Sequence, residues 1–441
     1  MSEYQSGARK GKSTREHHLT IRAIKEAAKE KKEEITAVYF DIKKCFDKMV
    51  LKEAMKELWM KGVKGKHWRL IYKLNSNNIL IPTTEIGECS QIKVKEMIKQ
   101  GSVLGSVISP ITIDSLTRIM NQCGNQWYME NIKINPLLFQ DDIFAVNKTE
   151  HIQDTIDIIE TFQDLKRLQF HEEKTKKSIL NGKKDETIYI NNVEIGRAEH
   201  HTYLGKIISE KTGEKEEISQ RITKAKAAVN ECMNIVNRKE LKHKRIGIGK
   251  RLLQTVIIPT LIFGAETWPT LTEKEKENMN SIQQQYMNRI LKLPKSTPGC
   301  AILNELDLMK IEHKANCRKL EYHIDLITRE NTKLEVKINN YQEEKNMKYN
   351  REINELKKTY NINEDLGALD QRRGKAIVRK AIQIKNSTEI KESLNNGIKT
   401  KNIGNNIKYM QCTKFNEAQI IFKAKCGMLN IRENFKRSYN N

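Results

Sequence analysis

The first half of the chain alternates short apolar runs with amphipathic segments. Apolar runs occur at 35–40 and on both sides of the polar tip 140–142, and such short runs bounded by polar residues are typical of buried strands. The segment 150–170 instead repeats apolar residues at helical spacing, with Ile152, Ile156, Ile159 and Phe162 on one side. The order strand, helix, hairpin, helix, strand predicts an α+β fold, an antiparallel sheet with helices on one face.

From about Lys215 the pattern becomes helical and basic. One helix is expected over 215–238, and a second begins within 242–251. A third starts at a capping box formed by Thr272 and Glu275, and we expect Pro294 to end it. Beyond about 330 apolar residues are sparse among Lys, Asn and Glu, which predicts extended helices that are partly disordered or that need a partner.

The net charge narrows the class of partner. The 441 residues carry 79 Lys and Arg against 56 Asp and Glu, a net charge of +23. So large an excess indicates a polyanionic partner, with nucleic acid the first choice. A membrane surface is a distant second, because no basic amphipathic helix has a face rich in Trp and Phe.

Cysteine usage and the N-terminus indicate the compartment. The eight cysteines form no Cys-x-x-Cys pair, so neither a zinc site nor a disulfide framework is expected. The N-terminus is polar and basic rather than a signal peptide, and no apolar run approaches the roughly 18 residues of a membrane span. We therefore expect an intracellular protein, nuclear or cytoplasmic.

Adjacent carboxylates at one hairpin tip are the main candidate for chemistry. Asp141 and Asp142 stand between two apolar runs, where Asp is also a common turn residue with no further role. A second acidic strand end, Asp41 after the apolar run 37–40, changes this interpretation. Carboxylates that converge from rigid neighbouring strands are what a two-metal site for hard divalent cations needs.

Three further segments carry weaker signals. The basic, glycine-containing stretch 5–14 offers backbone N–H groups and cations to phosphates, although it lacks P-loop spacing and is equally well a solvated loop. The Gly/Ser-rich stretch 99–110 opens a helix and lets backbone approach an anion, with close packing as the alternative. Phe46 follows Asp41 closely enough to stand beside a bound ligand, and by spacing alone a core contact is favoured.

Taken together, these segments resemble the reverse transcriptase of non-long-terminal-repeat (LINE-like) retrotransposons. The resemblance follows the family's motif order: motif A at 39–47, motif B at 100–105 with Ser109-Pro110, motif C at 139–142, motif D at 173–175, and the primer-grip motif E at 203–205. The stretch 5–14 is similar to the end of the fingers motif, and 221–326 resembles the family's helical thumb and downstream region.

The resemblance implies a role for each matching residue. Asp41, Asp141 and Asp142 would bind two Mg²⁺ ions, with Mn²⁺ as a substitute, and Lys174 would protonate the leaving pyrophosphate, unless it is a surface lysine. The nucleotide pocket would comprise Phe46, which excludes a ribose 2′-hydroxyl, and Gln100, Gly101, Arg9 and Lys12. The primer grip would comprise Tyr203, Leu204 and Gly205.

The implied architecture is a right hand with an incomplete set of fingers. We assign 1–34 to partial fingers, 35–210 to the palm, 211–330 to a helical thumb-like region and 331–441 to a basic C-terminal region that is helical or partly disordered. Two departures stand out: Gln140 replaces the usual Ala, and the upstream fingers and endonuclease region are missing. We therefore expect a truncated copy of a retroelement polyprotein.

The leading hypothesis is an RNA-directed DNA polymerase that extends a DNA primer on an RNA template with deoxynucleotides. The rival is a catalytically inactive remnant that only binds nucleic acid. An RNA-directed RNA polymerase is a weaker third reading, because Phe46 argues against ribonucleotides. The run 242–251 would serve either as a nuclear-import patch or as a thumb contact with the duplex.

Overall fold

The structure is a computed structural model that describes the chain except for residues 77, 95–97, 99–101, 211–214, 397–414 and 427–441. The chain forms two compact units. The first unit comprises 1–213 together with 330–345, and the second comprises 214–329 and the described residues from 346 onward. Residues 330–345 thus belong to the first unit, whereas the division expected from the sequence places residue 330 in the thumb-like region and 331–345 in the C-terminal region.

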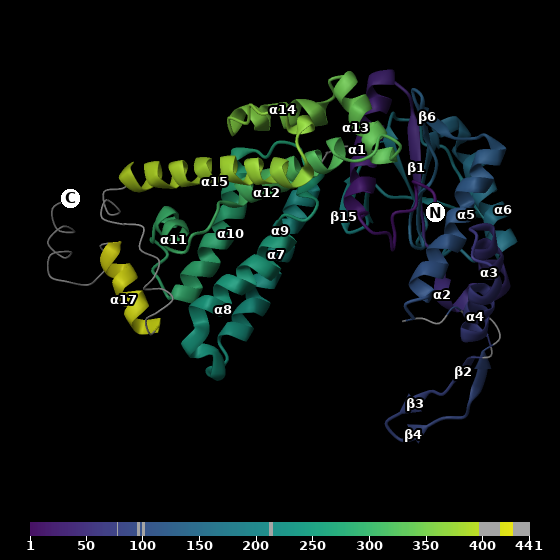
Figure 1. The fold of residues 1–441 in the computed structure, drawn as a ribbon, viewed down its shortest axis with the longest axis horizontal. Helices are drawn as coiled ribbons and strands as arrows, with labels where there is room; N and C mark the ends of the chain where they lie inside the picture. The colour runs from purple at the N-terminus through teal and green to yellow at the C-terminus, as the bar shows by residue number, and fades with distance from the viewer. Residues whose placement is uncertain (77, 95–97, 99–101, 211–214, 397–414, 427–441) are drawn as a thin grey trace. The chain divides into compact units, whose positions relative to one another are not determined.

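A five-stranded sheet forms the centre of the first unit (Figure 1). Its strand order is β13-β10-β1-β9-β8, with bounds β1 Ile35–Phe40, β8 Leu137–Phe139, β9 Asp142–Lys148, β10 Lys176–Asn181 and β13 Gly196–Arg197. The central strand β1 runs antiparallel to both β9 and β10. Every residue of β1 is buried, which explains why its sequence is a nearly continuous apolar run rather than an alternating one.

One face of the sheet packs against helices α3 (Leu51–Met60), α5 (Gly105–Cys123) and α6 (Ile152–Lys166). Their shared core includes Val38 and Phe40 of β1, Ile143 and Ala145 of β9, and the predicted α6 stripe of Ile152, Ile156, Ile159 and Phe162. The α+β class predicted from the sequence is confirmed.

The other face is covered by helix α1 (Thr14–Lys31) and by the hairpin β14 (His200–Tyr203)–β15 (Lys206–Ser209), a covering that the sequence did not predict. A capping box of Ser13 and Glu16 begins α1. Tyr39 of β1 and Phe144 of β9 point to this face, where their rings lie 5.3 Å apart, and each also contacts the ring of Tyr203. These aromatic contacts fasten the hairpin to the sheet.

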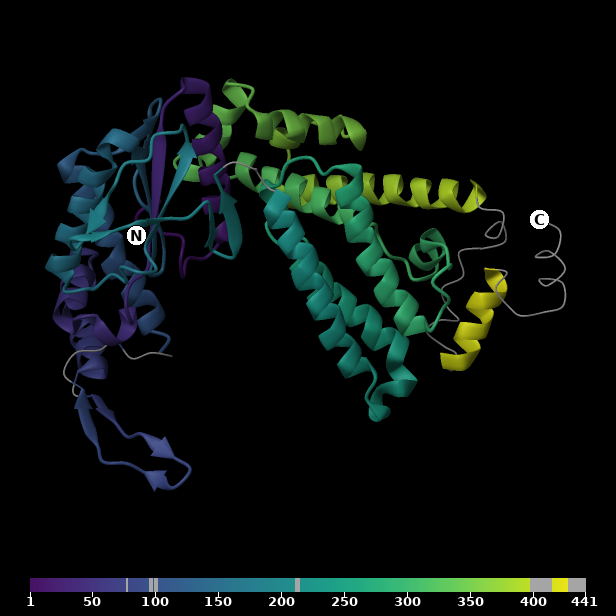
Figure 2. The ribbon, with the colours of Figure 1, turned by 180° about the vertical axis from the view of Figure 1, so that it is seen from behind.

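The second unit is largely helical (Figure 2). Its main helices are α7 (Lys215–Val236), α8 (Arg245–Leu252), α10 (Glu273–Leu291), α12 (Ile311–Ile327) and α15 (Gln371–Asn396). The capping box of Thr272 and Glu275 begins α10 as predicted. The helix ends at Leu291, earlier than the predicted stop at Pro294, because Lys292 adopts a left-handed conformation (φ 51°) that closes it.

The remaining elements are short. In the first unit they are α2 (Cys45–Lys48), α4 (Gly65–Asn75), α13 (Leu334–Glu344), β2 (Asn78–Leu80), β3 (Thr83–Thr84), β4 (Gly87–Glu88), β5 (Ile92–Val94), β6 (Trp127–Met129), β7 (Ile132–Ile134), β11 (Tyr189–Ile190) and β12 (Val193–Glu194). In the second unit they are α9 (Ile258–Leu261), α11 (Gly299–Glu305), α14 (Lys348–Thr359) and α17 (Phe415–Lys425). Among the described residues, none of the helices combines the length and apolar character needed to cross a membrane.

Candidate catalytic site

Strand register brings two of the three predicted aspartates side by side. Phe40, the last residue of β1, pairs with Ile143 of the antiparallel β9, so the next residue, Asp41, lies beside Asp142. Asp142 is the first residue of β9, and Asp141 belongs to the two-residue loop between β8 and β9. The apolar strands keep this end of the sheet rigid, while the carboxylates emerge where burial ends.

The three carboxylates interact electrostatically. Burial, together with the negative charges of Asp141 and Asp41, raises the pKa of Asp142 to about 6. Burial also raises the pKa of Asp141, with a smaller contribution from Asp41. The negative charges of these partly buried carboxylates repel one another. A divalent cation bound between them would stabilise their ionised forms.

Lys174 reaches the same site, as the motif D resemblance implied. Its Nζ lies 3.5 Å from Oδ2 of Asp41, and both side chains are largely accessible, 63% and 42% exposed. The backbone N–H of His171 donates to the Asp41 carbonyl at 2.7 Å, and the N–H of Lys174 donates in turn to the His171 carbonyl at 3.1 Å. These two hydrogen bonds therefore hold the backbone of Lys174 close to that of Asp41.

The donor set fits magnesium. Asp41, Asp141 and Asp142 offer only oxygen, the ligand type that hard divalent cations prefer. Within the described residues these three carboxylates are not gathered as tightly as Glu312, His313 and Glu389 of the second unit, whose ligand atoms all lie within 4.8 Å of one another.

The group around His313 is instead a satisfied hydrogen-bond network. His313 Nδ1 lies 2.8 Å from the Tyr360 hydroxyl, and its Nε2 lies 3.0 Å from Oε2 of Glu389. Glu389 also pairs with Lys310 at 2.8 Å. Each potential ligand already has a partner, so a metal would have to displace existing interactions, and we assign this group a structural role.

The N-terminal segment holds the tip of the motif C hairpin, a relationship that the sequence analysis missed. Residues 4–6 add a short parallel pairing to β8, with Ser6 N–H donating to the Leu138 carbonyl at 2.8 Å. The fully buried Gln5 side chain accepts from the N–H of Gln140 (3.0 Å) and of Gly7 (2.9 Å), and it donates to the carbonyls of Gln140 (3.3 Å) and Pro110 (3.5 Å). A single amide thus links motif C to the motif B helix.

Gln140 and Gly7 approach each other closely at this tip. Gln140 has φ 59°, the left-handed conformation that the first residue of a two-residue hairpin loop requires. A Cβ on Gly7 would lie 2.3 Å from the Gln140 backbone nitrogen, so only glycine fits here. In the sequence, the signal for this close contact is Gly7 within the basic stretch 5–14. That stretch is equally compatible with phosphate binding and with a solvated loop.

Arg9 and Lys12, the two cations expected to touch a triphosphate, are both engaged inside the first unit. Arg9 Nη1 donates to the carbonyls of Gln5 at 3.0 Å and of Ser2. Lys12 Nζ lies 2.5 Å from Oε2 of Glu335, and both side chains are buried. Their proposed role stays a prediction, and for Lys12 it would require this ion pair to break.

Motif A and motif B meet behind the carboxylates. Cys45 Sγ of α2 lies 3.6 Å from Ser109 Oγ of α5, and burial raises the pKa of the Cys45 thiol to about 12. Phe46 is partly buried against the core, and its backbone carbonyl accepts from the N–H of Ile98 at 3.0 Å. Gln100 and Gly101 lie outside the described residues.

The predicted primer grip forms the turn of the hairpin β14–β15. Leu204 (φ 47°) and Gly205 (φ 80°) are its two loop residues, and Tyr203 is buried beneath them. Burial raises the pKa of Tyr203 well above its ordinary value, and the charge of Asp142 adds to this, which ties motif E to motif C.

His17 of α1 joins the same cluster and was not singled out from the sequence. Its Nδ1 lies 3.0 Å from the Tyr203 hydroxyl, and its ring meets Phe139 of motif C edge-on at 6.0 Å. Burial lowers the pKa of His17 to about 3, so the ring is neutral at physiological pH. No sequence pattern around His17 distinguishes it from an ordinary core histidine.

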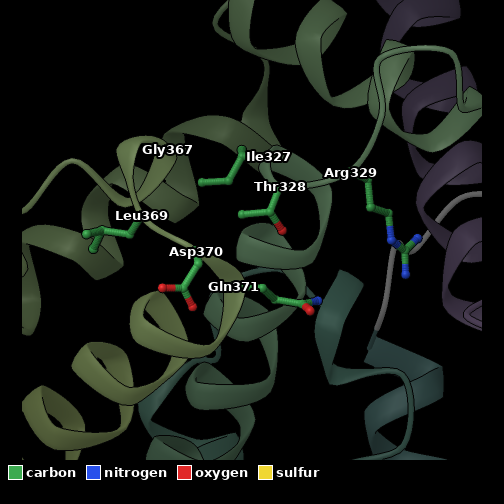
Figure 3. Close-up of a pocket in the computed structure, with 7 residues that line it drawn as sticks. All are labelled: Ile327, Thr328, Arg329, Gly367, Leu369, Asp370 and Gln371. Atoms are coloured by element: carbon green, nitrogen blue, oxygen red, sulfur yellow. The ribbon is translucent and has the colours of Figure 1, made fainter.

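Two further features belong to the second unit. A hollow of about 530 Å³ is lined by Ile327, Thr328 and residues at the start of α15 (Figure 3). Its Asp370 accepts from the N–H groups of Arg372 and Arg373 and so caps that helix. Within the basic run 242–251, Arg245 is buried and donates to the carbonyls of Ile290 and Arg289, which removes it from the surface.

A sheet that is antiparallel except for the parallel pair β10–β13, with acidic residues at the adjacent ends of two central strands, has the architecture of a polymerase palm. Residues 1–208 match the model of the family described as reverse transcriptase (RNA-dependent DNA polymerase). This part of the chain is therefore similar to a reverse transcriptase domain, and a largely helical region follows it. No curated protein sequence matches the chain.

Two solved telomerase structures share a distant likeness. The telomerase of Candida albicans, in complex with a fragment of telomeric RNA, is 12% identical with a TM-score of 0.38 and is matched over 70% of this chain and 55% of that one. The telomerase of Candida tropicalis, in complex with the same kind of fragment, is 10% identical with a TM-score of 0.38, over 86% and 53%. The chain thus spans about half the length of these proteins, and the assignment of the domain rests on the family model.

Proposed function

We propose that this chain is an RNA-directed DNA polymerase of a non-long-terminal-repeat retrotransposon. The observation that carries the proposal is the register of β1 and β9, which sets Asp41 beside Asp142 with Lys174 3.5 Å from Asp41. Three sequence motifs far apart along the chain supply these residues, and all lie in the part that matches the reverse transcriptase family. The retrotransposon origin rests on the motif resemblance.

In this proposal Asp41, Asp141 and Asp142 bind two Mg²⁺ ions. When bound, the ions would activate the primer 3′-hydroxyl as the nucleophile and stabilise the negative charge of the leaving pyrophosphate. Lys174 donates a proton to that pyrophosphate. Phe46 stands against the sugar of the incoming nucleotide and excludes a 2′-hydroxyl by steric conflict. The partly buried carboxylates with raised pKa values support the cation-binding role.

The substrate partners are an RNA template, a DNA primer and deoxynucleoside triphosphates. The net charge of +23 supports a polyanionic partner.

Primer extension on poly(rA)/oligo(dT) with Mg²⁺ tests the proposal. The chain is compared with the Asp141→Asn, Asp142→Asn double variant, which keeps the size of both side chains but removes their charge. Extension by the parent chain and its loss in the double variant are expected. Equal extension by both would show that other carboxylates, or a contaminant, perform the reaction.

A second candidate, a catalytically inactive remnant that binds nucleic acid, is favoured by one observation. The buried pair Lys12–Glu335 at 2.5 Å engages a cation that the family resemblance places at the triphosphate. Under this alternative the parent chain does not extend a primer, yet it binds the hybrid tightly. The Glu335→Gln variant releases Lys12, and extension that appears only in this variant would identify the pair as the block.

A further inference from the structure

A groove of the first unit is lined by residues of α3 and α4, with Arg118 of α5, and it shares none of them with the carboxylate site. Its volume is about 570 Å³, within the usual range of ligand sites. Three aromatic side chains line it: Trp59 at the end of α3, and Trp68 and Tyr72 on α4. None of these residues is used by the proposed polymerase chemistry.

The aromatic rings present accessible faces on a fixed support. Trp59 is 48% exposed and Tyr72 is 37% exposed, high values for such large apolar side chains. Trp68 anchors the group, because its Nε1 donates to the Met55 carbonyl at 2.9 Å. Its ring is parallel to that of Tyr72 at 5.7 Å and perpendicular to that of Trp59 at 6.0 Å. The groove therefore keeps its stacking surfaces without a ligand.

The segment that forms α3 and α4, the two main helices of the groove, carries a surplus of positive charge. Between 51 and 75 the chain carries seven Lys and Arg against two Glu, a surplus of five, and all seven cations are exposed: Lys52, Lys56, Lys61, Lys64, Lys66, Arg69 and Lys73. Lys64 Nζ stands 5.5 Å over the ring of Trp59. The acid that lines the groove, Glu57, is buried and already bound by Arg118 at 2.9 Å and by Lys166 at 2.6 Å. It offers no repulsion to an incoming anion.

We propose that this groove binds unpaired nucleic acid, with bases stacked on Trp59 and Tyr72 and phosphates held by the surrounding cations. Exposed aromatic rings among cations are the combination that binds single strands without sequence preference. A second copy of the chain fits less well, because each copy brings its own surplus of positive charge to the contact. The proposal extends the proposed function, since a polymerase template is unpaired on one side of the duplex.

The test measures the binding of fluorescein-labelled oligo(rU) and oligo(dT) of about 12 nucleotides, in the range of known single-strand site sizes, by anisotropy and without Mg²⁺ or nucleotides. Replacement of Trp59 by Ala is expected to weaken binding by about 5- to 150-fold, the effect of losing one base stack. The Tyr189→Ala variant removes an aromatic ring of equal exposure (48%) from β11 outside the groove, and it should bind like the parent chain.

A second readout is local to the groove. Of the four tryptophans, Trp127 and Trp268 are each only 2% exposed, so quenching of intrinsic fluorescence by an added oligonucleotide reports on Trp59 and Trp68. Two milder variants, Trp59→Phe and Lys64→Gln, cover the case in which Trp59→Ala does not fold. Each should bind the oligonucleotide more weakly than the parent. Unchanged affinity in all three variants would overturn the proposal, and so would a dimer that dissociates in Trp59→Ala while oligonucleotide binding stays constant.

The two oligonucleotides separate the sources of the strand. Tighter groove-dependent binding of oligo(rU) points to the template, and of oligo(dT) to unpaired DNA; either outcome supports the site. Because this assay needs no catalysis, groove-dependent binding without primer extension would retain the site and reject the polymerase. Primer extension together with oligonucleotide binding that does not depend on the groove would retain the polymerase and reject the site.

Discussion

The Gln5 side chain and the Gln140 backbone form a reciprocal pair: Oε1 of Gln5 accepts from the Gln140 N–H at 3.0 Å, and its Nε2 donates to the Gln140 carbonyl at 3.3 Å. Gln140 immediately precedes Asp141, so this pair fixes the backbone from which a predicted metal ligand projects. Gln5 contacts no reacting atom, and we regard it as a positioning residue.

Replacement of Gln5 by Ala should therefore loosen the hairpin tip. Leaving buried backbone groups without partners costs about 1–3 kcal/mol of unfolding free energy, measured by urea denaturation. In primer extension, kcat should fall more than KM rises, because the carboxylates rather than the substrate contacts are displaced.

Gln153 provides the matched control for this variant, because its amide also accepts from and donates to the backbone of one residue, Tyr189, in a hairpin away from the site. Gln153→Ala should leave kcat unchanged. A kcat loss of the same size in both variants would contradict the positioning role of Gln5.

Substitution of Gly7 by Ala should destabilise the same tip through steric conflict. The new Cβ would meet the Gln140 nitrogen at 2.3 Å, and forced overpacking of this kind costs about 1–3 kcal/mol. The measurement is the free energy of unfolding together with extension activity. Gly247→Ala serves as control, since nothing lies within 4 Å of its Cβ position in α8. A Gly7→Ala protein as stable and active as the parent would contradict the close approach.

Lys174 should act as a general acid rather than as a surface cation. Lys174→Met is expected to lower kcat by about 10²- to 10⁴-fold, the usual contribution of general acid catalysis. Lys174→Arg, which keeps the charge but donates a proton poorly, should also be slow. The measurement is kcat in primer extension for the parent and for both variants. If Lys174→Arg has the full activity of the parent, Lys174 acts only through its positive charge beside Asp41 and not as a general acid. The control is Lys183→Met, at an exposed position.

Stability should depend on pH through His17. Burial lowers its pKa in the folded protein to about 3, below the ordinary 6.5, so between these values the unfolded chain binds the proton that the native chain does not. The contribution of His17 to stability is complete above about pH 6.5 and is lost progressively as the pH falls toward 3.

The His17→Gln variant removes the titration while offering Tyr203 a polar partner. From pH 7 to 5, thermal unfolding temperatures should fall more steeply for the parent than for His17→Gln, and identical slopes would show that His17 does not titrate on unfolding. His67→Gln at an exposed position is the control.

Binding to an RNA–DNA hybrid should weaken steeply with salt. A surface that neutralises on the order of 5–10 phosphates releases a similar number of counterions, and the logarithm of affinity then falls linearly with the logarithm of salt concentration. Anisotropy titrations between low and physiological salt measure the slope. A flat response would show that the net charge of +23 does not serve nucleic-acid binding.

Much of the candidate site could be predicted because its chemistry is carried by local patterns. Buried strands that end in Asp41 and in Asp141–Asp142 are visible as apolar runs, and the capping box at Thr272 marks the start of α10 correctly. The helical spacing of Ile152 to Phe162 likewise predicts α6 and the face that it buries. In each case the determinant lies within a few residues along the chain, where periodicity and capping act.

The sequence by itself determined the class of the sheet, the acidic strand ends and the basic character of the protein. Only the tertiary structure decided which groups meet: Gln5 with Gln140, His17 with Tyr203, Lys12 with Glu335, and the three rings of the α3–α4 groove. These contacts join residues distant in sequence or on different elements, so no local period encodes them. They follow from how strands pair and helices pack once the whole core is buried.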